Sequence, residues 1–180
     1  MNAAPIKLIA LDVDGTLTNG LIHYDSDGAE HKSFHVADGL GIVMAQAIGL
    51  RFAVITGRRS PLVERRMTDD LKVADVLQKC GDKAAALRGL MEKYDLHSDE
   101  IAYIGDDIND LPAFQVAGLK IAVADAAVIV RAQADYVTER PGGCGAVREA
   151  IDIILQAQGR YEEAVAAFLA QSKASGTVGQ

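Results

Sequence analysis

Short apolar runs alternate with longer amphipathic segments along most of the chain, and this alternation limits the possible folds more than any other feature. The runs expected to form strands are 7–13, 51–57, 73–78, 100–107, 119–124 and 134–138. Helical spacing and helix-start residues predict helices at 39–48, 60–70, 82–94, 110–117, 126–133, 146–158 and 160–170. Such alternation predicts an α/β fold with a doubly wound, Rossmann-like, mostly parallel sheet and helices on both faces.

The first apolar run ends in two aspartates, Asp12 and Asp14, followed by Gly15 and a threonine. A buried parallel strand delivers the residues after it to the carboxyl edge of the sheet, where open α/β folds bind ligands. If strand pairing extends that far, both carboxylates point into one space. Two negative charges at such a short distance repel each other unless a cation lies between them or one carboxylate holds a proton. Metal binding and acid/base chemistry are therefore predicted, although Asp-Gly after a strand also forms ordinary turns.

Composition and charge exclude several classes of protein. The chain has 180 residues, of which 49% are hydrophobic, and this predicts a single domain over 1–171 with a sizeable core. A net charge of −7 disfavours nucleic acid as a partner, and no apolar run reaches the roughly 20 residues of a membrane span. Neither Cys80 and Cys144 nor the four histidines have zinc-site spacing, so we expect a cytoplasmic protein with reduced thiols.

The segment between the first strand and the first helix departs from the alternation. Residues 21–24 and 31–36 alternate with a period of about two around Asp27-Gly28, which predicts a β-hairpin over about 20–36. Because an isolated two-stranded ribbon is marginally stable in water, we expect it to pack against another subunit rather than form a free flap. At the other end of the chain, residues 172–180 predict a flexible C-terminal tail.

Three further groups of polar residues each follow a predicted strand. Thr56-Gly57 offers a hydroxyl and an open backbone N–H to phosphate, although Thr-Gly ends many strands. Lys83 lies in the first turn of a predicted helix, where anions are favoured, but taken alone it is more simply a surface lysine. Asp106, Asp107 and Asp110 offer oxygen ligands for Mg²⁺, or form a solvated acidic loop. Together with the first aspartates, the set predicts a phosphoryl-transfer site that uses magnesium.

In this order, DVDGT, ITG, Lys83 and GDDIND resemble the four motifs of the haloacid dehalogenase (HAD) superfamily, over about residues 6–150. The hairpin, DGLGI, ITGRR, ADYVT and GGxGAVRE resemble more closely the 3-deoxy-D-manno-octulosonate (KDO) 8-phosphate phosphatases within it. This resemblance implies a Mg²⁺-dependent phosphomonoesterase of lipopolysaccharide biosynthesis that forms a homotetramer. A hairpin and one helix fill the segment between Asp14 and Phe52, which leaves no room for a large cap domain.

The resemblance also implies the catalytic roles. Asp12 is the expected nucleophile, which forms an aspartyl-phosphate. Asp14 is expected to protonate the departing sugar oxygen and then to deprotonate the attacking water. Phosphate binding falls to Thr56, Gly57 and Lys83, and Lys83 also offsets the charge of the nucleophile.

Metal binding follows from the same family pattern. The expected ligands are the carboxylates of Asp12 and Asp106 and the backbone carbonyl of Asp14. Asp107 and Asp110 are expected to orient those ligands rather than to contact the ion.

A sugar acid carries a carboxylate besides its phosphate, so cationic side chains are expected near the mouth of the site. Arg58 and Arg66 are the candidates, although Arg66 also fits a solvated helix face. The family match further places against the substrate His35, Val36, Ala37, Asp38, Gly39 and Asn109. Ala37 and Val43 stand where the family often has arginine, which bears on substrate identity and not on phosphate chemistry. Arg160 or Lys173 of another subunit is a candidate replacement.

Three alternatives remain open at this level. One is a phosphatase for another sugar acid, such as a nonulosonate 9-phosphate, whose relatives tend to carry an acidic residue at the position of Arg58. Another is a phospho-receiver module, but receivers place the acidic pair before the phosphorylated aspartate along the chain. The third is a non-catalytic oligomerisation domain, which the intact set of acidic, threonine and lysine positions disfavours.

Overall fold

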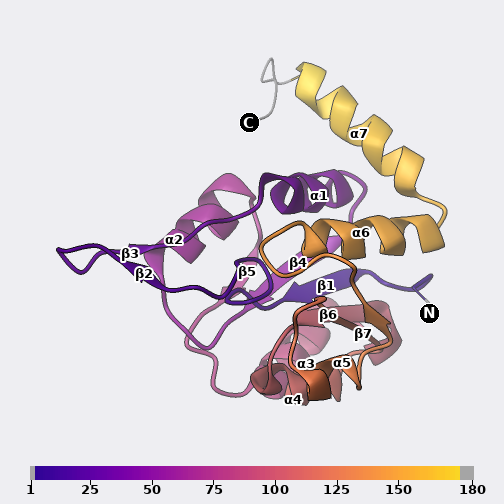
Figure 1. The fold of residues 1–180 in the computed structure, drawn as a ribbon. Coiled ribbons are helices and arrows are strands. Elements are labelled where there is room, and N and C mark those ends of the chain that lie inside the picture. Colours follow the sequence, from indigo (N-terminus) through magenta and orange to yellow (C-terminus); the bar gives the residue numbers. More distant parts are fainter. Residues whose placement is uncertain (1–2, 175–180) are drawn as a thin grey trace.

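The computed structural model describes residues 3–174, and a single six-stranded sheet forms its centre (Figure 1). The strands are β1 (Leu8–Leu11), β4 (Arg51–Ile55), β5 (Asp75–Leu77), β6 (Ile101–Gly105), β7 (Leu119–Ala122) and β8 (Tyr136–Val137). They lie in the order β5-β4-β1-β6-β7-β8, and every neighbouring pair is parallel. All six runs expected to be strands are strands, and the predicted doubly wound α/β fold is confirmed.

The central position of β1 determines where the first aspartates lie. Its four residues are completely buried, as expected of an apolar strand covered on both faces. Leu11 is in register with Val54 of β4 on one side and Ile104 of β6 on the other. Asp12 therefore emerges at the same edge of the sheet as the segments that follow β4 and β6.

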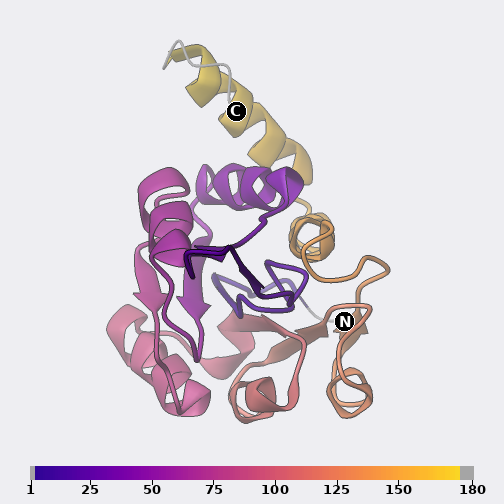
Figure 2. The ribbon, with the colours of Figure 1, turned by 60° about the vertical axis from the view of Figure 1, so that its left-hand side comes forward.

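Helices cover both faces of the sheet (Figures 1 and 2). On one face lie α1 (Val36–Gln46) and α6 (Ala146–Ala157), and α7 (Tyr161–Ala174) packs against both of them. The other face is covered by α3 (Lys83–Tyr94), α4 (Leu111–Phe114) and α5 (Val128–Arg131). α2 (Pro61–Glu64) continues into a π-helical turn, η1 (Arg65–Asp70), and the short turns are η2 (Ser98–Glu100) and η3 (Ile108–Asp110). The sheet and its two helix layers enclose the apolar core.

Some boundaries differ from the sequence-based expectation. The helix expected at 60–70 is divided between α2 and η1, and the one expected at 110–117 begins as η3 and ends at Phe114. α7 continues to Ala174, so residues 172–174 are helical rather than part of a tail. Residues 175–180, the remainder of the predicted tail, lie outside the described residues, and the flexibility of that tail stays a prediction.

The predicted hairpin is present as a separate ribbon of β2 (His23–Tyr24) and β3 (Glu30–His31), which protrudes beyond the sheet (Figure 1). Its turn is closed by Asp25, whose Oδ1 accepts hydrogen bonds from the N–H groups of Asp27 and Ala29, each at 2.9 Å. The strands are shorter than the alternation over 21–36 suggests, and His35 at the end of that segment already caps α1. Within residues 3–174, the hairpin and α1 are the elements between β1 and β4, so no large cap is present.

Candidate active site

The segments that follow β1 and β6 meet the start of α3 at the carboxyl edge of the sheet. Lys83, the first residue of α3, places its Nζ 2.9 Å from Asp12 Oδ1 and 2.6 Å from Asp110 Oδ1. Carboxylate oxygens of Asp12, Asp106 and Asp110 all lie within 4.8 Å of one another. Three acidic side chains and one ammonium from distant parts of the sequence thus share one small, largely buried space.

A tight turn after β1 shapes this space. The N–H groups of Thr16, Leu17 and Thr18 all point at the carbonyl of Val13, and Gly15 adopts φ +99°, which disfavours any other residue. A Cβ at Gly15 would lie 2.0 Å from the Asp106 carboxylate. Glycine therefore allows the Asp106 side chain to approach the turn that carries the aspartates.

Asp106 and Asp110 are fixed by different neighbours. Asp106 accepts a hydrogen bond from the Thr16 hydroxyl at 2.8 Å, which orients its carboxylate toward the turn after β1. Asp110 is completely buried and accepts from the Tyr103 hydroxyl at 2.8 Å and from the Asp106 N–H at 2.8 Å, besides Lys83. These bonds use its oxygens to hold Lys83 and the 106–110 loop in place.

Asp107 takes no part in the carboxylate cluster. Its side chain is exposed, and its Oδ1 accepts from the N–H of Ile108 at 2.7 Å, where it caps η3. The loop therefore directs Asp106 and Asp110 inward and Asp107 outward.

Burial, together with the crowding of acidic groups, shifts the pKa values of this cluster. Burial, followed by the neighbouring Asp110 charge, raises the pKa of Asp12 to about 6 against the opposing effect of Lys83. Burial also raises the pKa of Asp106 to about 7, although its hydrogen bond from Thr16 works in the other direction. For Lys83, burial disfavours the ammonium, but the charges of Asp12 and Asp110 outweigh it and raise its pKa. For both carboxyls burial is the main cause of the raised pKa, and the neighbouring acidic charges add to it.

A divalent cation fits this donor set. The clustered ligand atoms are all carboxylate oxygens, with no histidine or cysteine among them, and hard cations such as Mg²⁺ prefer such ligands. Two of the three carboxyls have pKa values raised by burial and mutual repulsion, which a cation among them would relieve. The residues present therefore match the metal that the motifs imply.

Asp14 lies beside the cluster and faces a different set of partners. Its carboxylate forms an ion pair with Lys32, just after β3, and its Oδ2 lies 3.7 Å from Nε of Arg58. Arg58 in turn donates from Nη2 to Oε1 of Glu30 at 2.8 Å. The hairpin thus contributes two charged residues, Glu30 and Lys32, that the sequence analysis did not single out. The only sequence signal for them is their place in the alternating segment after the first motif.

Thr56 and Gly57 directly follow β4, the neighbour of β1 in the sheet. Thr56 is buried, and its Oγ1 faces the N–H of Arg58 at 3.4 Å, whereas Gly57 is exposed. The carbonyl of Thr56 accepts from Cys80 N–H at 3.0 Å, which ties this loop to the segment before Lys83. The expected phosphate-binding residues therefore flank the Asp12 cluster on the β4 side.

The residues expected against the sugar are more dispersed. Arg58 is partly exposed beside Asp14, whereas Arg66 covers Gly39 and pairs with Asp70 at 3.4 Å. Asp38 is buried, and its Oδ1 accepts from the Arg148 N–H at 2.8 Å, so it joins α1 to the start of α6. The other residues expected against the substrate have different surroundings. His35 caps α1, Val36 and Asn109 are exposed, and Ala37 is half-buried.

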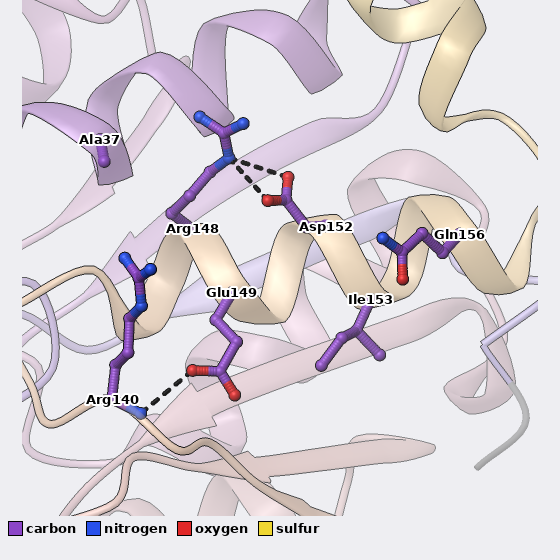
Figure 3. A pocket seen from close by; sticks show the side chains of 7 residues that line it. All are labelled: Ala37, Arg140, Arg148, Glu149, Asp152, Ile153 and Gln156. Carbon is purple, nitrogen blue, oxygen red and sulfur yellow. Dashed lines mark hydrogen bonds and ion pairs between the residues drawn. The ribbon is translucent and has the colours of Figure 1, made fainter.

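A cavity of about 380 Å³ lies between the start of α1 and α6 (Figure 3). It is lined by Ala37, Arg140, Arg148, Glu149, Asp152, Ile153 and Gln156. Its charged groups are largely engaged with one another or with backbone: Nε of Arg148 donates to both Asp152 oxygens at 2.8 and 2.9 Å, and the Arg140 N–H donates to Glu149. Ala37 is the only predicted site residue among its lining, so the cavity is distinct from the Asp12 cluster.

A glycine-rich loop after β8 closes over the turn that follows β1. The N–H of Gly143 donates to the carbonyl of Thr16 at 3.0 Å. A Cβ at Gly142 would lie 1.7 Å from the carbonyl oxygen of Gly15, so the two backbones touch directly. The loop between β8 and α6 therefore fixes the segment that carries Asp12 and Asp14.

Comparison with known proteins agrees with this architecture. Residues 62–151 match the family model of the haloacid dehalogenase-like hydrolases. The chain is 44% identical over 162 residues to the KDO 8-phosphate phosphatase of Salmonella typhi, covering 90% of this chain and 86% of that protein. Within residues 3–174, no helix has the length and apolar character needed to cross a bilayer.

Two solved structures extend the similarity to three dimensions. The KDO 8-phosphate phosphatase of Moraxella catarrhalis, in complex with magnesium, phosphate and KDO, has a TM-score of 0.88 at 44% identity, covering 93% of this chain and 95% of that one. The cobalt-bound enzyme of Haemophilus influenzae has a TM-score of 0.87 at 43% identity, covering 94% and 99%. The chain therefore belongs to the haloacid dehalogenase-like hydrolases and, within them, to the family of the KDO 8-phosphate phosphatases.

Proposed function

We propose that the protein is a Mg²⁺-dependent phosphatase that hydrolyses KDO 8-phosphate to KDO and inorganic phosphate. The observation that carries this proposal is the largely buried group of Asp12, Lys83, Asp106 and Asp110, with Lys83 2.9 Å from Asp12. A relative of 44% identity has been solved with magnesium, phosphate and KDO bound, which supports the same substrate here.

The chemistry divides between the two aspartates of the first motif. A carboxylate oxygen of Asp12 attacks phosphorus, the bond from phosphorus to the sugar oxygen breaks, and Asp14 gives that oxygen a proton. Water then attacks the aspartyl-phosphate, the bond from phosphorus to Asp12 breaks, and Asp14 takes the water proton. Asp12 begins and ends this cycle as a carboxylate beside Lys83, whose ammonium limits the build-up of negative charge.

The remaining groups hold the reactants in place. Asp12 and Asp106, with the backbone carbonyl of Asp14, would hold the metal, and Asp110 orients Lys83 and the 106–110 loop. Mg²⁺ bound there supplies positive charge that stabilises the oxygens of the transferring phosphoryl group. Thr56 and Gly57 are positioned to bind the phosphate, at the end of the strand that neighbours β1.

Arg58 is our candidate for the substrate carboxylate. Its side chain is 41% exposed and lies beside Asp14. It can therefore reach a bound sugar acid whose phosphate ester oxygen lies next to Asp14. Arg66 and Asn109 are weaker candidates, because Arg66 covers Gly39 and Asn109 is exposed.

The decisive experiment assays a panel of phosphorylated sugar acids for phosphate release, with and without EDTA. We expect KDO 8-phosphate to be preferred over a nonulosonate 9-phosphate by more than about tenfold in kcat/KM, or about 1.4 kcal/mol in the transition state. Addition of EDTA should abolish turnover, and added Mg²⁺ should restore it. A preference for the nonulosonate 9-phosphate would identify it as the substrate in place of KDO 8-phosphate. Full activity in EDTA would refute the metal-dependent mechanism.

We also propose that the hairpin mediates a homotetramer of this chain in the cytoplasm. Its exposed apolar side chains support a subunit contact: Leu21, Ile22 and Tyr24 are 58%, 45% and 63% exposed. Cys80 and Cys144 are free thiols, as expected of a reducing compartment. Sedimentation of the purified protein at micromolar concentration tests the assembly, and a monomer there would contradict it.

A further inference from the structure

Lys32 is an exception on the hairpin. The residues of β2 and β3 are mostly exposed, whereas the side chain of Lys32, directly after β3, is only 1% exposed. Its Nζ forms an ion pair with Asp14 Oδ1 and lies 3.6 Å from Oε1 of Glu30. Burying an ammonium is costly unless it is paired, and the carboxylates of Asp14 and Glu30 supply that pairing.

The two oxygens of Asp14 have different surroundings. Oδ1 is bound by Lys32, in contact close enough for a charge-assisted hydrogen bond. Oδ2 lies 3.7 Å from Nε of Arg58, which is too long for a hydrogen bond, and that Nε has no hydrogen-bond partner. Lys32 therefore holds Oδ1 of the carboxylate by a hydrogen bond, whereas Oδ2 has only the longer ion-pair contact with Arg58.

We propose that Lys32 is a positioning residue for Asp14, and that the hairpin contributes to catalysis through it. With Oδ1 held by the ammonium, Oδ2 is the oxygen that exchanges a proton with the sugar oxygen and then with water. Glu30 assists by pairing with both Lys32 and Arg58, so that two cations and two carboxylates balance at the root of the hairpin. This inference rests on the proposed function, because it assigns Asp14 the acid/base role.

An aryl phosphate separates the two half-reactions. 4-Nitrophenolate is a good leaving group and needs no proton from Asp14, so the first half-reaction proceeds without the acid. In the second half-reaction, the oxygen of water bonds to phosphorus, the bond to Asp12 breaks, and the water proton passes to Asp14. A variant with a poorly placed Asp14 should therefore release one 4-nitrophenolate per active site quickly and then turn over slowly.

The experiment measures 4-nitrophenyl phosphate hydrolysis by stopped flow with Mg²⁺ present, for wild type, Lys32→Met, Lys32→Arg and Lys93→Met. In Lys32→Met we expect the ratio of the burst rate to the steady-state rate to rise at least about tenfold, since misplacing a catalytic group by 1 Å costs up to about 10²-fold. Lys32→Arg, which keeps a cation that can reach Oδ1, should stay within about threefold of wild type. Lys93→Met removes a lysine from its ion pair with Asp75, at the start of β5, and should match wild type.

Two results would overturn the inference. One is a Lys32→Met enzyme with unchanged rates, and the other is a loss of burst and steady-state rates in equal proportion, which indicates a purely structural role. If Lys32→Met does not fold, Lys32→Gln replaces it with the same expectation, because the shorter amide is polar but carries no charge to hold Asp14. Failure of the proposed phosphatase chemistry is distinguishable, because the wild type would then release no 4-nitrophenolate with Mg²⁺, whereas a different sugar-acid substrate would leave this test unchanged.

Discussion

Nζ of Lys83 lies 2.9 Å from Oδ1 of Asp12, and both side chains are almost completely buried. Replacing Lys83 with methionine keeps most of the side-chain length and leaves the acidic cluster without its ammonium. Because an unpaired buried charge is costly, we expect Lys83→Met to lose about 3–5 kcal/mol of unfolding free energy in metal-free buffer. Urea denaturation measures this, and Mg²⁺ should recover part of the loss. Lys93→Met, which removes a half-exposed partner of Asp75, should cost much less than Lys83→Met. Equal losses of unfolding free energy in the two variants would contradict the conclusion that Lys83 stabilises the acidic cluster.

Asp12→Asn should remove turnover without unfolding the protein. The amide keeps the shape of the side chain but cannot attack phosphorus as a carboxylate does, and Lys83 keeps Asp110 as its partner. We expect kcat to fall by at least about 10³-fold, in line with the loss of other catalytic nucleophiles. Phosphate release and far-UV circular dichroism provide the two measurements. A folded variant with substantial residual kcat would argue against a covalent intermediate.

Arg58→Ala should weaken binding of the sugar acid more than it weakens binding of a simple aryl phosphate. A charge-assisted hydrogen bond to a carboxylate contributes about 1.5–3 kcal/mol, so KM for KDO 8-phosphate should rise about 10- to 100-fold. KM for 4-nitrophenyl phosphate, which has no carboxylate, should change little. The neighbouring Arg59 is exposed and serves as the matched control, because Arg59→Ala removes the same charge one residue away. Equal KM increases for both substrates would exclude Arg58 as the carboxylate ligand.

Stability of the metal-free protein should depend on pH through Asp12 and Asp106. Burial raises their pKa values from 3.8 to about 6 and about 7 in the folded state. A raised pKa means that the folded state binds protons more tightly than the unfolded chain, so this stabilisation is full below pH 3.8. It is lost as pH rises through about 6 and about 7.

Thermal melts across pH 5 to 8, with and without Mg²⁺, test this dependence. In EDTA, the contribution of the two carboxyls to Tm should decline with rising pH. The rise in Tm on adding Mg²⁺ should be largest at pH 8, where protons no longer compete with the ion for the carboxylates. Asp106→Asn removes one of the two groups and should flatten the decline between pH 6 and 8. A gain from Mg²⁺ that is the same at pH 5 and pH 8 would contradict the shifted pKa values.

Gly142→Ala should disturb the turn after β1 that carries Asp12 and Asp14, whereas Gly89→Ala should not. The new Cβ at position 142 would lie 1.7 Å from the backbone oxygen of Gly15, so one of the two backbones must move. We expect a loss of about 1–3 kcal/mol, as for other overpacked sites, together with a fall in kcat. Gly89 is exposed in α3 with no atom close to its Cβ position, so alanine should gain roughly 0.5–1 kcal/mol. Thermal melts and phosphate release distinguish the two variants.

Much of the fold follows from the sequence, because a buried parallel strand needs a short run that is apolar on both faces. The run around β1 meets this condition, and so do the runs around β4 and β6.

The π-helical turn η1 could not be predicted in this way. The carbonyl of Arg66 accepts from Leu71 N–H five residues on, and both Met67 and Leu71 are buried. Spacing alone does not indicate such a turn, because it depends on how these two side chains pack into the core.

The site divides in the same way. Asp12, Lys83 and Asp106 are predictable because they follow strands whose carboxyl ends meet at one edge. Tyr103 lies within an apolar run, where the pattern favours a core residue, and only the fold shows its hydroxyl 2.8 Å from Asp110. Lys32 reaches Asp14 because the hairpin folds back toward the first motif, and no local pattern in the sequence encodes that return.

The central position of β1 has a consequence for synthesis of the chain. Of the six strands of the sheet it is made first, and both of its neighbours, β4 and β6, are made later. Until Ile101–Gly105 has emerged, one side of Leu8–Leu11 has no backbone partner, and such an open edge attracts strands from other molecules. Newly made copies therefore depend on rapid completion of translation, or on chaperones, more than a sheet assembled from consecutive hairpins does.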